Sequence, residues 1–462
     1  MGEAYDVAVI GSGPGGYVAA IRAAQRGATV ACIDRGPLGG TCLNRGCIPT
    51  KALLEASHLV VMAKRAKRFG VEFAEPTLDF IKMMEHKDAV VGVLGRGVGQ
   101  LFEKNGITVM RGVAKLVGRT EVRVGSAAGE PSVITAKKII LATGSEPLNV
   151  PAFPFDGKRV LSSAALLRQK QLPESLLVVG GGYIGCELAC FFAEVGCHVT
   201  MVEQLDRLLP LGDADVSAEI TKALKRLKVK VHTGAKLEAL EADGGKVAGT
   251  LAGGEAVEAE KALVAVGRKL NSEGVGLEEA GVRVGDKGEI PVNEHCQTNV
   301  SNIYAVGDVT GVMLLAHLAS RMGIVAAEHA TGKDSRIDYE VVPACVFTHP
   351  EVAGVGLTES EAAERGLEAR AFRFPVPVLG KAQAVGEQAG FVKLVGDAKT
   401  GQLLGAQIVC SRAGDLIAEA ALGLRLEVTI EEIAHTIHTH PTLAEGLMEA
   451  AEGWLGEGIH YG

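Results

Sequence analysis

The sequence predicts an α/β protein in which two similar parallel-sheet units, the first interrupted by the second, precede a C-terminal α+β domain. A strand–glycine turn–helix–strand pattern covers residues 6–34 and recurs from residue 176. The stretch 301–308 returns to the texture of the first unit, and from about residue 339 alternating strands and turns replace it. Strands that alternate with helices indicate parallel sheets, because a crossover helix has to connect them.

The first unit contains a G-x-G-x-x-G turn formed by Gly11, Gly13 and Gly16. An apolar strand precedes this turn and a helical run follows it, which is the context that dinucleotide binding requires. The first glycine makes the tight turn, the second lets a pyrophosphate approach the backbone, and the third permits close packing of helix on strand. The next strand ends at Asp34, whose carboxylate can accept hydrogen bonds from ribose hydroxyls. The pattern therefore predicts a Rossmann-like dinucleotide site.

The second unit repeats the first at one constant offset. Five positions match (Gly11, Gly13, Gly16, Gly27 and Asp34 with Gly180, Gly182, Gly185, Gly196 and Glu203). Five matches at a single offset indicate two dinucleotide sites in one chain. Glu203 would repel a 2′-phosphate, and no cationic residue replaces it, so the second site is predicted to prefer NAD over NADP.

A short segment with two cysteines, Gly39–Lys51, lies between these motifs. Cys42 and Cys47 are five positions apart, and a helix-forming run follows Pro49, so Cys47 is expected near a helix N-terminus. Such a position stabilises a thiolate and favours thiol–disulfide exchange. Two ordinary buried thiols are the alternative, and a zinc site is less favoured because no second pair of ligands follows.

Three histidines lie close together near the C-terminus, at positions 435, 438 and 440. A metal site is disfavoured, because no cysteine or carboxylate completes a ligand set nearby and Pro441 interrupts the helical spacing. Pro441 at a helix start would place Glu445 one turn in, where it can orient His440 as a general base. A buried, hydrogen-bonded histidine is the alternative, and the upstream dithiol, which needs a proton acceptor, favours the dyad.

The overall composition excludes several classes of protein. The 462 residues carry a net charge of −8, which gives no electrostatic reason to expect nucleic acid. No apolar run reaches the roughly 18 residues that a membrane span needs. An apolar strand starts at Asp6 and leaves no room for a signal peptide. Nine scattered cysteines do not suit a secreted disulfide framework, so we expect a cytoplasmic protein.

These motifs together resemble the flavin-dependent pyridine-nucleotide disulfide oxidoreductases, and the resemblance covers essentially the whole chain. It implies an FAD domain formed by 1–148 and completed by 271–338, with an NAD domain at 149–270 between the two parts. It also implies a C-terminal dimerisation domain at 339–462, and hence a homodimer. A disulfide between Cys42 and Cys47 is the redox-active group that the resemblance implies.

The resemblance also assigns roles to individual residues. It places His440 and Glu445 in the acid–base motif, Glu187 in a pair with Lys51 beside the flavin, and Tyr183 over the flavin ring until NAD displaces it. The residues that it assigns to FAD are Gly11, Gly13, Gly16, Asp34, Lys51, Ala114, Thr143, Gly144, Ser145, Asp308, Leu314, Leu315, Ala316 and His317. The residues that it assigns to NAD are Gly180, Gly182, Tyr183, Gly185, Glu187, Glu203 and Gly267.

Within the family the sequence is most similar to members that oxidise dihydrolipoyl groups with NAD. This similarity implies service to a 2-oxo acid dehydrogenase or glycine cleavage complex, with lipoyl domains, a core acyltransferase or the glycine cleavage carrier protein as partners. It also implies that His440 acts across a dimer interface, on the disulfide of the other subunit. The alternatives are a reductase of another small disulfide such as glutathione, which Glu203 disfavours, and a non-catalytic scaffold subunit, which the intact cysteines and His440 disfavour.

Overall fold

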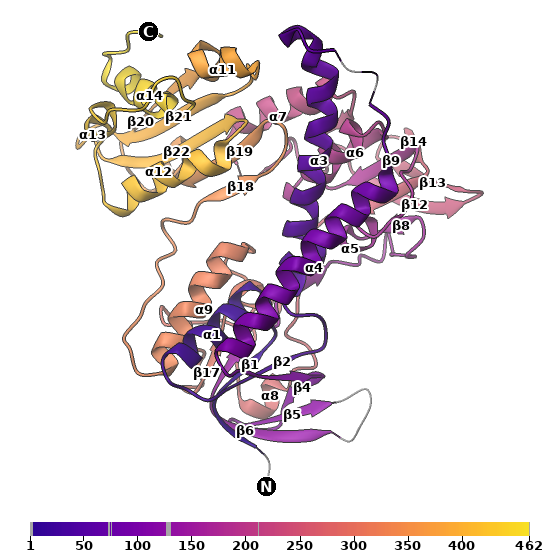
Figure 1. Ribbon diagram of the computed structural model, residues 1–462, viewed down its shortest axis with the longest axis vertical. Helices are drawn as coiled ribbons and strands as arrows, with labels where there is room; N and C mark the ends of the chain where they lie inside the picture. The colour runs from indigo at the N-terminus through magenta and orange to yellow at the C-terminus, as the bar shows by residue number, and fades with distance from the viewer. Residues whose placement is uncertain (1–2, 73, 75, 126–130, 211, 462) are drawn as a thin grey trace.

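The computed structural model describes residues 3–461 except 73, 75, 126–130 and 211, and three bodies make up the fold (Figure 1). The first body is built on a seven-stranded sheet in the order β3-β2-β1-β6-β5-β4, with β17 paired to β6. Its strands are β1 (Ala4–Ile10), β2 (Val30–Asp34), β3 (Thr108–Arg111), β4 (Val113–Leu116), β5 (Glu121–Gly125), β6 (Ser132–Leu141) and β17 (Ile303–Ala305). Its helices are α1 (Pro14–Gln25), α2 (Gly40–Arg45), α3 (Cys47–Arg65), η1 (Ala66–Phe69), α4 (Phe80–Lys104), α8 (Leu277–Ala280), η2 (Gly307–Thr310) and α9 (Ala316–Ala330).

The second body has a five-stranded parallel sheet in the order β11-β10-β9-β15-β8. These strands are β8 (Val160–Leu161), β9 (Ser175–Val179), β10 (His198–Val202), β11 (Lys230–His232) and β15 (Lys261–Val264). The three-stranded antiparallel sheet of this body consists of β12 (Leu237–Asp243), β13 (Lys246–Leu251) and β14 (Ala256–Ala259). The helices are α5 (Ser163–Leu166), α6 (Tyr183–Glu194) and α7 (Ala214–Arg226).

The chain leaves the first body for the second and returns to it at one place. There β7 (Ser145–Pro147) pairs antiparallel with β16 (Arg268–Leu270). Beyond this point β17 pairs parallel with β6, and α9 packs on α1 (Figure 1). The helices approach closely because a Cβ atom on Gly323 would lie 2.3 Å from the carbonyl oxygen of Gly15. The predicted interruption of the first unit by the second is therefore confirmed.

The third body is an antiparallel sheet in the order β18-β19-β22-β21-β20. Its strands are β18 (Ala344–Val346), β19 (Glu351–Gly356), β20 (Ala369–Pro375), β21 (Phe391–Asp397) and β22 (Leu403–Cys410). Its helices are α10 (Glu359–Glu364), η3 (Val376–Val378), α11 (Gly380–Val385), α12 (Ala413–Arg425), α13 (Ile430–Ala434) and α14 (Glu445–Leu455). The α+β character predicted for the C-terminal part is confirmed.

One buried apolar cluster connects the three bodies. It includes Leu53 of α3, Phe191 of α6 and Phe391 of β21, all at most 1% exposed. Helix α3 also packs against α6. Because burial of apolar surface is the main favourable contribution to folding, this cluster fixes α3 against both the second and the third body. The first residue of α3, Cys47, is thereby held in a defined position.

Candidate active site

The predicted redox segment folds into two consecutive helices. Cys42 lies in α2 and Cys47 is the first residue of α3, and the two form a disulfide with their Cα atoms 4.6 Å apart. Gly46 between them is the N-cap of α3, and the hydroxyl of Thr50 donates to its carbonyl at 2.7 Å. The predicted helix N-terminus at Cys47 is confirmed, so the unpaired N–H groups of the first turn favour negative charge on its sulfur.

The first glycine turn lies directly against this segment. A Cβ atom on Gly40 would lie 2.4 Å from the Cα atom of Gly13, so only glycine allows this contact. Within the turn, a Cβ atom on Gly11 would lie 2.2 Å from the carbonyl oxygen of Ala142, and one on Gly16 would lie 1.9 Å from that of Gly11. The redox segment and the start of α1 therefore meet backbone to backbone.

Each of the two glycine turns is held to the acidic residue that ends the next strand. Asp34 accepts hydrogen bonds from the backbone N–H of Ser12 at 2.7 Å and from its hydroxyl at 2.6 Å. Glu203 accepts a hydrogen bond from the backbone N–H of Gly181 at 2.5 Å and another from that of Leu205 at 2.7 Å. Ser12 and Gly181 occupy equivalent positions in the two turns, so the repeat extends from sequence to hydrogen bonding.

The second turn leaves room where a ligand would approach. Gly180 and Gly185 fit as tightly as their counterparts, since Cβ atoms there would lie 2.5 Å from the carbonyl oxygen of Ala265 and 2.0 Å from that of Gly180. Around the Cβ position of Gly182, by contrast, no described atom apart from those of the adjoining residues lies within 4 Å. Tyr183, the first residue of α6, is partly buried, and burial raises the pKa of its hydroxyl.

Glu187 connects the redox helix to the other two bodies. Both of its carboxylate oxygens lie 2.9 Å from Nζ of Lys51, and Oε1 also accepts a hydrogen bond from the backbone N–H of Phe347 at 2.9 Å. Nζ of Lys51 lies 4.5 Å from the centroid of the Phe347 ring. The predicted pairing of Lys51 with Glu187 is confirmed.

Ser145 and Asp308 meet at the place where the chain crosses between the first and second bodies. The Ser145 hydroxyl donates to the Asp308 carboxylate, and Arg268 donates at 2.7 Å to both the hydroxyl and the carbonyl of Ser145. Arg268 was not predicted from the sequence, where its only signal is its place directly after Gly267. Close by in the chain, Oγ1 of Thr143 is buried without a hydrogen-bond partner among the described residues.

The remaining residues predicted at the cofactors are spread over several elements. Ala114 is buried in β4, and Gly144 has a left-handed backbone (φ +69°) that suits glycine. Leu314 and Leu315 lie directly before α9, which begins at Ala316. Nε2 of His317 lies 2.7 Å from the carbonyl oxygen of Pro343.

His440 and Glu445 form the predicted pair, but the local structure differs from the prediction. Nδ1 of His440 lies 2.8 Å from Oε1 of Glu445, whose Oε2 accepts a hydrogen bond from the N–H of Thr442 at 2.7 Å. Helix α14 begins at Glu445 and not at Pro441, and the bond from Thr442 to the Glu445 carboxylate is a contact typical of the start of a helix. Burial opposes ionisation, yet the hydrogen bonds from Thr442 and His440 lower the pKa of Glu445.

His440 and the disulfide do not come together within one chain. The His440 side chain is 77% exposed. The α13–α14 segment that carries it lies on the far side of the third body from the start of α3 (Figure 1). A base in the same reaction as the cysteines therefore requires a second subunit.

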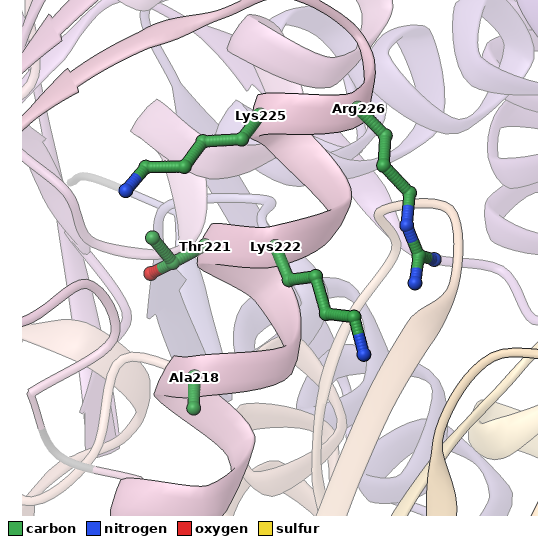
Figure 2. Close-up of a pocket in the computed structure, with 5 residues that line it drawn as sticks. All are labelled: Ala218, Thr221, Lys222, Lys225 and Arg226. Atoms are coloured by element: carbon green, nitrogen blue, oxygen red, sulfur yellow. The ribbon is translucent and has the colours of Figure 1, made fainter.

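A surface hollow of about 480 Å³ along α7 is unrelated to these residues. It is lined by Ala218, Thr221, Lys222, Lys225 and Arg226, which project from successive turns of this one helix (Figure 2). None of the residues predicted at the active site lines it. A single helix face does not enclose a substrate, so we assign no function to this hollow.

Two nucleotide-type turns and a disulfide at a helix N-terminus against the first of them define a nucleotide-dependent disulfide oxidoreductase. Residues 5–323 match the family model for pyridine nucleotide-disulphide oxidoreductases, and residues 342–451 match the dimerisation domain of these enzymes. The chain belongs to the pyridine nucleotide-disulphide oxidoreductase family. The dimerisation domain supports a homodimer.

Individual members of this family are similar to the chain over nearly its whole length. The chain is 45% identical to the dihydrolipoyl dehydrogenase of Thermus scotoductus over 464 residues, covering 99% of each chain. It is 43% identical to that of Chlamydia muridarum over 454 residues, covering 98% of this chain and 97% of the relative. The crystal structure of LpdA from Mycobacterium tuberculosis superposes with a TM-score of 0.91 at 29% identity, covering 98% of this chain and 99% of that one.

The cofactors of the family, FAD and NAD, fit the residues present. The glycines of both turns hold the backbone open where a side chain would block a pyrophosphate, and each turn is followed by an acid for ribose hydroxyls. The buried, unpaired hydroxyl of Thr143 indicates a polar partner that the described residues do not supply. As for membranes, none of the helices in the described part of the chain combines the length and apolar character of a membrane span.

Proposed function

We propose that this enzyme oxidises protein-bound dihydrolipoyl groups to lipoyl groups and reduces NAD⁺ to NADH, the activity of a dihydrolipoamide dehydrogenase. The observation that carries the proposal is the Cys42–Cys47 disulfide at the start of α3, in a chain that matches dihydrolipoyl dehydrogenases over nearly its whole length. The dithiol of the substrate and the disulfide of the enzyme are a matched pair, since one becomes oxidised as the other is reduced.

Thiol–disulfide exchange is the step that this chain's own residues carry out. One substrate thiolate attacks Sγ of Cys42, the Cys42–Cys47 bond breaks, and Cys47 leaves as a thiolate stabilised by the N-terminus of α3. The second substrate thiol then displaces Cys42, which gives the cyclic lipoyl disulfide and a reduced enzyme. FAD, when bound, supplies the transfer of the electron pair from the dithiol to the nicotinamide.

His440 is proposed as the base that removes the protons of the substrate dithiol. Glu445 holds Nδ1 of its ring at 2.8 Å, which leaves Nε2 to receive a proton. General-base assistance of this kind is typically worth about 10²–10⁴-fold in rate. Because the α13–α14 segment that carries His440 lies apart from the start of α3 (Figure 1), we propose that His440 of each subunit serves the disulfide of its partner.

The first unit is proposed to hold FAD and the second NAD. Gly11, Gly13, Gly16 and Asp34 would bind the pyrophosphate and ribose of FAD, and Lys51 would lie beside its ring system. The corresponding NAD residues are Gly180, Gly182, Gly185 and Glu203, with Tyr183 and Glu187 near the nicotinamide. Thr143, Ser145, Asp308 and the start of α9 would complete the FAD site, with Arg268 fixing Ser145 and Asp308.

The proposal extends to partners and compartment. Lipoyl domains and the core acyltransferase of a 2-oxo acid dehydrogenase complex, or the carrier protein of glycine cleavage, would supply the dihydrolipoyl group. The scattered cysteines, unsuited to an oxidising compartment, support a cytoplasmic location. A reductase of glutathione with NADP is not favoured, because the carboxylate of Glu203 would lie next to the 2′-phosphate.

A steady-state assay of the purified, FAD-loaded protein tests the proposal. Dihydrolipoamide with NAD⁺ should give rapid turnover, whereas glutathione disulfide with NADPH should give almost none. Cys42→Ser and Cys47→Ser should each abolish turnover with the flavin still bound, since the glycine turns hold FAD independently of the sulfurs. Faster turnover of glutathione disulfide than of lipoamide would refute the assignment.

A further inference from the structure

A second cluster of titratable side chains lies away from the active site, between α6 and the third body. Cys190 and Glu194 are one helical turn apart on α6, and His349 reaches them from the segment between β18 and β19. Each of the three residues offers one potential metal-ligand atom, and these three atoms all lie within 4.8 Å of one another. Residues four apart on a helix share a face, so the Cys190–Glu194 spacing aims both side chains at His349.

The hydrogen bonds of the cluster converge on one oxygen atom. Nδ1 of His349 lies 2.7 Å from Oε1 of Glu194, and Sγ of Cys190 lies 3.6 Å from the same atom. The Glu194 side chain is 1% exposed, and Cys190 is fully buried. The thiol of Cys190 and the imidazole of His349 thus both lie close to one buried carboxylate oxygen. A cation between these three atoms would contact the sulfur, the nitrogen and the oxygen.

We propose that Cys190, Glu194 and His349 form a binding site for one Zn²⁺ ion or a chemically similar borderline-soft divalent cation. Thiolate and imidazole ligands select this class, whereas Mg²⁺ and Ca²⁺ require oxygen ligands. Binding displaces the thiol proton of Cys190 to solvent. The thiolate and the carboxylate then balance the charge of the ion, so the buried site is neutral overall, as a low-dielectric interior requires.

Helix α3 supplies the surroundings of this site. The hydroxyl of Ser57 donates to the other oxygen of Glu194 at 2.5 Å, which fixes the carboxylate in orientation. The ring of His58 lies 4.5 Å from the His349 ring, centroid to centroid, and its Nδ1 is buried without a hydrogen-bond partner among the described residues. His58 therefore offers an unused nitrogen beside the cluster, as a partner for a water molecule on the ion.

The ion would act as a structural clamp between the three bodies. Cys190 and Glu194 belong to the second body, His349 to the third, and Ser57 and His58 to α3 of the first. Helix α6 also carries Glu187, and α3 also carries Cys47 and Lys51, so the clamp would stiffen the two helices that frame the redox centre. Metal binding is therefore expected to raise the thermal stability of the protein without changing the reaction that the protein catalyses.

Zinc binding to the holoenzyme tests the site. The protein is stripped of metal with a chelator, kept oxidised so that the Cys42 and Cys47 sulfurs remain paired, and titrated with Zn²⁺. One ion per chain is expected, with a sulfur scatterer at about 2.3 Å in zinc-edge X-ray absorption and a higher melting temperature. A Cys42→Ala/Cys47→Ala double variant should bind zinc equally well. No stoichiometric ion, or only nitrogen and oxygen scatterers, would overturn the proposal.

Substitutions locate the ion. Cys190→Ser should remove the sulfur scatterer, and Ser57→Ala should weaken binding by about 10- to 100-fold while keeping it. Cys197→Ser, at a buried thiol of the same body outside the cluster, is the matched control and should leave binding unchanged. A sulfur scatterer that persists in Cys190→Ser refutes the site. If that variant does not fold, Co²⁺ in the wild-type protein decides: tetrahedral cobalt bands with thiolate charge transfer support the site, and octahedral bands refute it.

Discussion

Lys51 and Glu187 come from helices of different bodies, and Nζ of Lys51 lies 2.9 Å from both carboxylate oxygens of Glu187. The Glu187 side chain is 7% exposed. A buried carboxylate is costly unless a charged or hydrogen-bonding partner compensates it, and here the other partner is the backbone N–H of Phe347. The pair therefore connects the redox helix α3, the nucleotide helix α6 and the third body through one carboxylate.

Lys51→Met should destabilise the protein, because it leaves Glu187 buried with one remaining hydrogen-bond donor. The expected loss is about 2 kcal/mol, measured by chemical unfolding with FAD in excess. Lys67→Met is a matched control, since the Lys67–Glu72 pair has a separation of 3.7 Å and is largely exposed, and it should have no measurable effect. Equal unfolding midpoints for the two variants would contradict the account of the buried pair.

The seven cysteines outside the disulfide should resist alkylation in the folded protein. Burial raises the pKa of Cys197, Cys296 and Cys410 to about 12, and it raises that of the other four thiols (Cys32, Cys186, Cys190 and Cys345) as well. A raised thiol pKa keeps the unreactive, protonated form, so at pH 8 only about one part in ten thousand of a thiol with pKa 12 is thiolate.

Mass spectrometry after iodoacetamide treatment at pH 8 checks this expectation. The oxidised enzyme should take up no label, and the enzyme reduced with NADH should take it up at Cys42 and Cys47 alone. Labelling of a third cysteine before unfolding would show that burial does not protect that thiol.

Glu203→Arg should shift the enzyme from NAD towards NADP. A guanidinium can bind a 2′-phosphate that the carboxylate repels, and the ratio of kcat/KM for the two nucleotides should change by about tenfold or more. Glu203 also accepts the N–H groups of Gly181 and Leu205, so the variant should lose some stability. Glu203→Gln, which keeps an acceptor oxygen without the charge, should give an intermediate ratio. An unchanged ratio in both variants would place ribose recognition elsewhere.

Mixed dimers should recover activity if His440 serves the partner's disulfide. Cys42→Ser and His440→Ala homodimers are each expected to be inactive, and subunit exchange between them gives heterodimers. With shared sites, a heterodimer has one site with both defects and one intact site, so up to half of the wild-type activity per heterodimer should return. With sites complete in single chains, every site keeps one defect and the mixture stays inactive.

Motifs with fixed local spacing were predictable from sequence, because each is confined to one strand–turn–helix segment. The glycine turns, Cys47 at the start of a helix and the contact between His440 and Glu445 all follow from residues at most a few positions apart. The Lys51–Glu187 pair was reached through the family resemblance alone, since 136 positions separate the two residues and neither carries a local signal.

Contacts between the three bodies could not be predicted from local sequence patterns, because they join residues that lie far apart in the chain. Arg268 holds Ser145 and Asp308 only because β7 and β16 pair, and the Cys190, Glu194 and His349 cluster exists only because α6 meets the third body. The start of α14 at Glu445 was also missed. Proline at a first helical position is a statistical preference, and here Pro441 lies four residues before the first residue of α14.

The pairing of β17 with β6 has a consequence for how the protein forms on the ribosome. Residues Ile139–Leu141 of β6 receive this neighbour only after residues 303–305 have been synthesised. The second body, by contrast, has all of its strands once residue 264 has left the exit tunnel. Domains generally fold as units during synthesis, and long-range strand pairing is slow. The second body is therefore expected to fold before the first body is complete. Until β17 has been synthesised, the first sheet exposes an unpaired, apolar edge of β6. The nascent chain is expected to need a chaperone most during this period.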